Sequence, residues 1–127
     1  MAPTILVVDD EELVRAQIGA SLEFDGFRIA QAANGSEAID WLRHNTADVM
    51  LTDILMPTKG GIETIQDARR LHPDMKIIAM SGRVRTEAVD FLDVAQQFGA
   101  HGILFKPFGR TQLLALVRKL LSEANSL

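Results

Sequence analysis

Short apolar segments alternate with longer stretches of helical period along the whole chain. The apolar segments are rich in β-branched residues, and two of them, read as ILVV and VML, are continuous rather than alternating, which is typical of strands buried on both faces. We predict β-strands at 4–8, 28–32, 48–53, 76–81 and 102–105.

The stretches between these segments predict five α-helices. Apolar positions recur every three to four residues, and a glycine, Gly99, or a proline, Pro73, follows two of the stretches. Asn34 or Ser36 is the expected N-cap of the second helix, with Glu37 three residues after Asn34. Four of the helices are predicted at 11–24, 37–44, 62–71 and 84–98. The fifth is predicted in the last helical stretch of the chain, where Leu113, Leu116, Val117, Leu120 and Ala124 share one face.

Strict alternation of strands and helices predicts an α/β fold, with a parallel sheet covered by helices on both faces. A chain of 127 residues fits one domain with one core. In such sheets ligands bind at the carboxyl ends of the strands, so the residues that follow each strand are the candidates for chemistry.

Polar side chains do follow four of the five predicted strands. Asp9 and Asp10 follow the first, Asp53 the third, Ser81 the fourth, and Lys106 with Pro107 the fifth. Each has a simpler interpretation as a helix cap, a turn residue or a solvated lysine, and Glu11 and Glu12 are assigned only to a helix start. Taken together, however, three acids at one edge repel one another unless a cation offsets them.

Carboxylate oxygens without histidine or cysteine ligands indicate a hard cation, and Mg²⁺ fits best because it takes few protein ligands and keeps several waters. A metal beside a carboxylate, a lysine and a hydroxyl indicates phosphoryl transfer. The chain has no Walker phosphate-binding loop and no glycine-rich dinucleotide motif after the first strand.

Composition narrows the classes further. The net charge of −4 and the pI of about 5.3 do not favour DNA or an anionic membrane as a partner. There is no cysteine, and the N-terminus lacks the pattern of a signal peptide. No apolar run has membrane-spanning length. We expect a cytoplasmic protein with no direct contact to nucleic acid and no membrane insertion.

Four segments in order carry a family resemblance: VVDDEE, DVMLTDILMPTKGGIE, IIAMSG and GAHGILFKPF. Together they resemble the receiver domains of two-component response regulators, of the single-domain chemotaxis type. The resemblance covers nearly the whole chain and implies one receiver domain over 1–127. It also implies the flavodoxin-like (βα)5 doubly wound sheet with strand order 2-1-3-4-5.

The resemblance implies a role for each site residue. Asp53 would accept a phosphoryl group from a sensor histidine kinase or a histidine phosphotransfer protein. Asp9, Asp10, Asp53 and the backbone carbonyl of Leu55 would hold Mg²⁺, for which Mn²⁺ can substitute. The protein would catalyse only its own phosphorylation and dephosphorylation.

The remaining site residues would respond to the phosphoryl group. Ser81 and Lys106 would contact its oxygens, and the Lys106–Pro107 peptide bond would be cis. Signalling to a downstream protein would change the surface of the fourth helix, fifth strand and fifth helix, in a monomer or a phosphorylation-dependent dimer.

Three features depart from the common pattern of the family. Ile103 stands where an aromatic residue is usual, and Phe105 is expected on the opposite face of that strand. The segment 82–98 is longer than usual, and Leu55 and Arg83 flank the expected phosphoryl group. Because Leu55 offers no polar group to orient a water and Arg83 could cover the phosphoryl group, we predict slow self-dephosphorylation.

Three other functions stay open. After the stand-alone receiver, the second hypothesis is a receiver module of a longer regulator that has a DNA-binding or enzymatic output. A flavodoxin-fold enzyme or nucleotide binder is disfavoured by the absence of a phosphate-binding loop. A degenerate receiver that acts as a scaffold is disfavoured by the complete set of acids and lysine.

Overall fold

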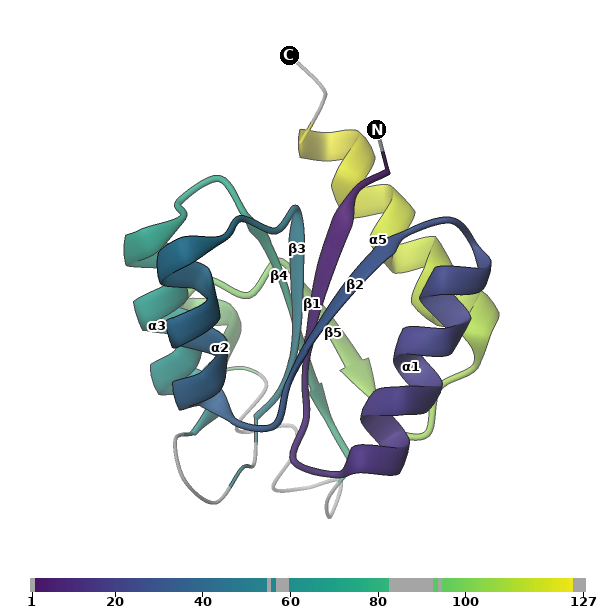
Figure 1. Cartoon of the computed structure of the whole chain (residues 1–127), viewed down its shortest axis with the longest axis horizontal. Helices are drawn as coiled ribbons and strands as arrows, with labels where there is room; N and C mark the ends of the chain where they lie inside the picture. The colour runs from purple at the N-terminus through teal and green to yellow at the C-terminus, as the bar shows by residue number, and fades with distance from the viewer. Residues whose placement is uncertain (1, 55, 57–59, 83–92, 94, 125–127) are drawn as a thin grey trace.

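The computed structural model describes residues 2–54, 56, 60–82, 93 and 95–124. A five-stranded parallel sheet lies at its centre, in the order β2-β1-β3-β4-β5 (Figure 1). The predicted fold class and strand order are therefore confirmed. The strands are β1 (Thr4–Val8), β2 (Arg28–Ala32), β3 (Val49–Asp53), β4 (Lys76–Ser81) and β5 (Gly102–Phe105), and the helices are α1 (Glu12–Phe24), α2 (Gly35–His44), α3 (Gly61–Leu71) and α5 (Arg110–Ala124).

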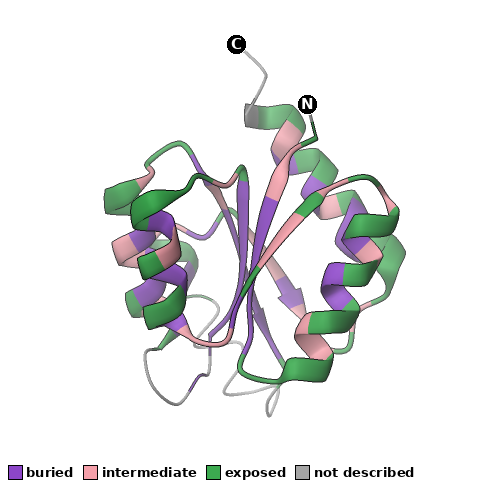
Figure 2. Cartoon of the chain, in the orientation of Figure 1, coloured by how far each residue is buried: buried purple, intermediate pink, exposed green. Residues whose placement is uncertain are grey.

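The sheet separates two apolar layers because neighbouring residues of a strand face opposite sides. Ile5 and Val7 of β1 face α1 and α5, whereas Leu6 and Val8 face α2 and α3. After their first residue, the central strands β1 and β4 are buried, and β3 is buried throughout (Figure 2), which explains their continuous apolar sequences. Burial on both faces fixes the register of β1 and β3, whose carboxyl ends carry Asp9 and Asp53.

Helix starts settle two of the open interpretations. Asn34 caps α2, since its side chain accepts a hydrogen bond from the Glu37 backbone N–H at 2.9 Å. Glu37 in turn accepts one from the Ala33 backbone N–H at 3.1 Å, so the two form a reciprocal cap. The N-cap of α1 is Glu11 rather than Asp10, and it makes no side-chain capping bond. The interpretation of Asp10 as a helix cap is therefore wrong.

The last strand corrects one expectation. Ile103 and Phe105 both pack against the layer formed with α2 and α3, while Leu104 packs on the other side. The prediction that Phe105 faces away from Ile103 is wrong, because residues two apart in a strand share a face.

Most of the predicted fourth helix, 84–98, lies outside the described residues; within it, residue 93 and residues 95–97 are helical.

His101 ties the edge of the sheet together at the end opposite to the acidic residues. Its Nδ1 atom accepts a hydrogen bond from the Ile77 backbone N–H at 3.0 Å, which only an unprotonated nitrogen can do. Burial, and then the charges of Lys76 and Arg69, lower the pKa of His101. Glu123 acts in the opposite direction but does not reverse the shift.

The stability of the fold is therefore expected to depend on His101 in a defined pH window. A histidine whose pKa is lowered by folding stabilises the protein fully above its unfolded pKa of about 6.5, and this contribution is lost as the pH falls. The free energies of unfolding of the parent and of His101→Ala should differ most at pH 8 and converge toward pH 5. Urea denaturation at both pH values checks this, and an equal difference at both would contradict it.

Among the described residues, no helix is long and apolar enough to cross a membrane.

Candidate functional site

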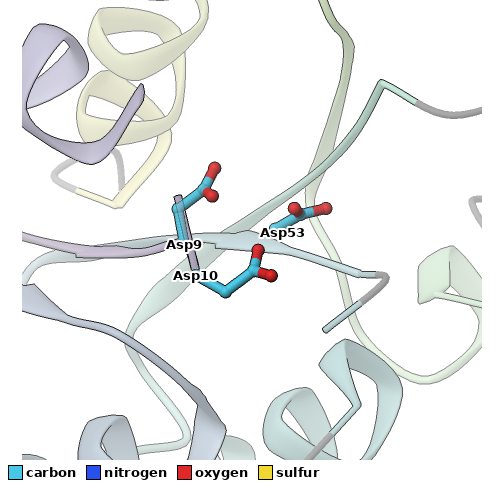
Figure 3. Close-up of side chains that lie close together, drawn as sticks. All are labelled: Asp9, Asp10 and Asp53. Carbon is cyan, nitrogen blue, oxygen red and sulfur yellow. The ribbon is translucent and has the colours of Figure 1, made fainter. Parts of the chain in front are cut away.

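The carboxyl ends of β1 and β3 bring three carboxylates together (Figure 3). Asp9 and Asp10 follow β1 directly, and Asp53 is the last residue of β3, its neighbour in the sheet. One carboxylate oxygen of each lies within 4.8 Å of the others. Asp9 and Asp53 are buried, whereas Asp10 is exposed. The predicted cluster of acids is therefore present, with one open side.

Asp9 is held by contacts on both oxygens of its carboxylate. Oδ1 accepts a hydrogen bond from the Glu11 backbone N–H at 2.9 Å. Oδ2 accepts one from Lys106 Nζ at 2.6 Å. Its side chain is fully buried, so these contacts replace the water that the charge loses.

Lys106 connects the two buried acids. Its Nζ atom lies 2.6 Å from Asp9 Oδ2 and 3.3 Å from Asp53 Oδ2. Burial by itself would lower the pKa of Lys106, but the hydrogen bond to Asp9 and the charges of Asp53 and Asp9 outweigh it, and the pKa lies above its usual value. Lys106 is therefore protonated at neutral pH. The interpretation of Lys106 as a solvated lysine is wrong, since only 15% of its side chain is exposed.

The ends of β4 and β5 place Ser81 and Lys106 beside this cluster. Ser81 is the last residue of β4 and is buried; it pairs with Phe105, and its carbonyl accepts a hydrogen bond from the Lys106 backbone N–H at 2.8 Å. The Lys106–Pro107 bond is cis, as the family resemblance implied. Ser81 and Lys106 thus come from adjacent strand ends.

Gly82 is a residue that the sequence pattern did not single out. A Cβ atom at this position would lie 2.9 Å from Cβ and 3.1 Å from Cδ of Lys106. Real Cβ atoms essentially never approach another atom closer than 3.0 Å, so the absence of a side chain at Gly82 leaves room for the stem of Lys106 to run toward the acids. The only signal in the sequence was the pair Ser-Gly at a strand end.

A groove opens from the acidic cluster between α1 and the start of α5. Its volume is about 1040 Å³, and Asp10, Asp53 and Lys106 are among the residues that line it. Val14, Phe108 and Leu113 contribute an apolar stretch. The side chains of Asp10 and Asp53 are therefore accessible from this groove.

The donor set fits a magnesium ion. Three carboxylates against one lysine leave an excess of negative charge, and the cluster holds oxygen ligands without histidine or cysteine. The exposed position of Asp10 leaves a side on which the ion can keep its waters. Leu55 and Arg83 lie outside the described residues, so the predictions that concern them stay predictions.

This combination of fold and strand-end residues defines a family. The sequence profile described as "Response regulator receiver domain" matches residues 5–118. The chain belongs to the response regulator receiver domain family. Its acidic pocket consists of Asp9, Asp10 and Asp53, with Lys106 beside it.

Curated relatives and solved structures agree with this assignment. The chain is 37% identical over 126 residues to the response regulator MprA of Mycobacterium sp. (strain KMS). The aligned region covers 98% of this chain and 53% of that protein. MprA of Mycobacterium tuberculosis (strain ATCC 25618 / H37Rv) is 36% identical over 122 residues, covering 95% and 51%. The chain therefore spans about half the length of the curated relatives it matches.

Two receivers of similar length show the same fold. A CheY-like receiver domain protein of Methanospirillum hungatei JF-1 superposes with a TM-score of 0.92 at 26% identity, covering 98% of both chains. The chemotaxis protein CheY4 of Vibrio cholerae superposes with a TM-score of 0.85 at 25% identity, covering 94% of this chain and 99% of that one.

Proposed function

We propose that the protein is a phospho-accepting receiver in a two-component phosphorelay, with Asp53 as the acceptor. The observation that carries the proposal is the position of the Asp53 carboxylate. It belongs to a cluster of three carboxylates, it is paired with Lys106 at 3.3 Å, and Asp53 lines an open groove. The donor is the phosphohistidine of a sensor kinase or of a phosphotransfer protein.

The transfer is a displacement at phosphorus. An oxygen of Asp53 forms a bond to phosphorus while the bond from phosphorus to the histidine nitrogen breaks, and the electron pair returns to the imidazole. The product is an acyl phosphate on Asp53 and a neutral histidine on the donor, after proton exchange with solvent. Lys106 remains protonated and lies where it can contact a phosphoryl oxygen. Ser81, at the adjacent strand end, would donate a hydrogen bond from its hydroxyl to another phosphoryl oxygen.

Asp9, Asp10 and Asp53 would hold Mg²⁺, with the Leu55 carbonyl as a further ligand. When bound, the ion neutralises part of the negative charge that accumulates on the transferring oxygens. Asp9 would contact both the ion and Lys106, because one of its carboxylate oxygens is already paired with Lys106 at 2.6 Å. Asp10 is exposed and is therefore the side chain most able to adapt to the ion.

Phosphorylation is expected to require a divalent cation. We expect the parent to gain one phosphoryl group from acetyl phosphate in Mg²⁺ or Mn²⁺ and none in excess chelator, because donor and acceptor are both anionic. Intact-mass spectrometry measures the gain. Asp10→Ala should raise the Mg²⁺ concentration needed for half-maximal uptake by at least about tenfold, by analogy with the loss of a metal-site contact. Undiminished uptake in chelator would exclude this mechanism.

The output is a protein contact. The phosphoryl group adds roughly −1.5 to −2 charges at the site, and the expected response is a change in the surface that β5 and α5 present together with the fourth helix. A downstream protein reads this surface, in a monomer or in a dimer that forms on phosphorylation. The receiver domain spans 1–127.

A second candidate is a receiver module of a longer regulator. It is favoured by one observation, namely that the chain covers only 53% of the relative from Mycobacterium sp. (strain KMS). Sequencing the transcript that encodes the chain distinguishes the two, since a module would be followed in frame by an output domain.

A further inference from the structure

Arg15 joins three elements next to the acidic cluster. It lies on α1, and its Nη1 atom donates a hydrogen bond to the backbone carbonyl of Asp9 at 2.8 Å. Its Nε atom donates to Oε1 of Gln31 on β2 at 3.1 Å. The guanidinium therefore links the end of β1 to both α1 and β2. A planar group with several donors in fixed directions is suited to such a double contact.

The contact to the Asp9 carbonyl bears on Asp10. The peptide unit is planar, so a carbonyl that is held at Asp9 also holds the backbone nitrogen and Cα of the next residue. The direction in which the Asp10 side chain leaves the backbone is thereby restricted. Asp9 itself is further held through its own N–H, which donates to the Ala32 carbonyl at 3.2 Å. Asp10 is exposed, so its backbone is the part that the fold can position.

We propose that Arg15, anchored by Gln31, is a positioning residue that sets the geometry of the Asp9–Asp10 pair for divalent cation binding. The inference rests on the proposed function, since it assigns to Arg15 a role in the metal site of the receiver. Arg15 touches neither the ion nor the phosphoryl group in this role. It acts through the peptide between the two acids, as groups outside the ligand set orient the ligands of other metal sites.

A purely electrostatic role for Arg15 predicts the opposite result. Its positive charge lies beside the acids, and removing it would leave the site more negative and would tighten cation binding. If Arg15 instead positions the acids through the Asp9 carbonyl, removing that contact would weaken cation binding. The sign of the change in Mg²⁺ affinity therefore separates the two roles.

The experiment titrates MgCl₂ into the ¹⁵N-labelled chain and follows the backbone amide signals of Asp10 and Asp53. We expect Arg15→Met to raise the Kd for Mg²⁺ about tenfold, in the range seen for supporting contacts of metal sites. Gln31 is exposed, and Gln31→Leu leaves the net charge unchanged. This variant should raise the Kd for Mg²⁺ about threefold, since Arg15 keeps one of its two contacts. Arg43→Met is the matched control, because it removes an equal charge on α2 from a pair with Asp40, and it should bind like the parent.

A second measurement separates positioning from general damage. The rate of phosphoryl uptake by Arg15→Met from acetyl phosphate should be low at limiting Mg²⁺ and should approach that of the parent at saturating Mg²⁺. A defect that is equal at all Mg²⁺ concentrations overturns the inference.

An Arg15→Met or Gln31→Leu variant that binds Mg²⁺ as tightly as the parent, or more tightly, also overturns it. If Arg15→Met does not fold, which the same spectra show, Gln31→Leu decides by its Kd. Failure of the proposed function looks different, because then the parent itself shows no Mg²⁺-dependent shifts at Asp10 and Asp53.

Discussion

Asp53→Asn is expected to abolish phosphoryl uptake. The amide has nearly the same shape as the carboxylate and can still accept a hydrogen bond from Lys106, which lies 3.3 Å from Asp53 Oδ2 in the parent. It is not a competent nucleophile toward phosphorus, however, and it removes one charge from the cation site. The parent should gain one phosphoryl group from acetyl phosphate in Mg²⁺, and the variant none.

Intact-mass spectrometry at several reaction times gives the measurement. Asp67→Asn is the matched control, since it makes the same chemical change on α3, where the side chain pairs with Arg70 at 3.0 Å. The control should take up phosphoryl like the parent. Equal uptake by Asp53→Asn would show that another residue is the acceptor, and peptide mapping of that product would identify it.

Gly61→Ala is expected to have the largest effect on stability. A Cβ atom at Gly61 would lie 2.4 Å from the Ile54 Cα and 2.6 Å from the Asp53 carbonyl oxygen, both of which are backbone atoms that cannot rotate away. The start of α3 and the chain after β3 must therefore separate, and the Gly61 N–H bond to the Ile54 carbonyl at 2.8 Å is stretched or lost. We expect a loss of about 3 kcal/mol in the free energy of unfolding, at the upper end for overpacking.

The preceding glycine provides the control. A Cβ atom at Gly60 would meet nothing within 4 Å, and the backbone φ of −65° suits any residue. Gly60→Ala should therefore change the free energy of unfolding by less than about 1 kcal/mol, as expected at an N-cap. Urea denaturation of both variants makes the comparison. Similar losses in the two would show that the contact of Gly61 with β3 is not the cause.

The position of Gly61 also connects stability to function. The chain that follows Asp53 runs against the start of α3, so a displacement there moves the candidate acceptor. We expect Gly61→Ala to lower the rate of phosphoryl uptake even at temperatures where the variant is folded. The Gly60→Ala control should not.

Local sequence was sufficient for the five strands and for the residues at their ends. The segments read as strands agree with the structure to within one residue, since short β-branched runs such as TILVV are typical of strands buried on both faces of a sheet. Alternation of strand and helix predicted the parallel sheet, and a parallel sheet places every carboxyl end at one edge. For this reason Asp9, Asp53 and Lys106 could be predicted as neighbours from their positions after strands.

Contacts between distant residues were decided only by tertiary structure. No pattern in the sequence states that Arg15 reaches the Asp9 carbonyl and Gln31, or that Lys106 pairs more closely with Asp9 than with Asp53. These pairings depend on the twist of the sheet and on the distance from each helix to its strand. The glycines at 61 and 82 belong to the same class, because the atoms that exclude a side chain there come from other strand ends. Sequence periodicity records which face of an element is buried, whereas the partner on that face is set by how the elements pack.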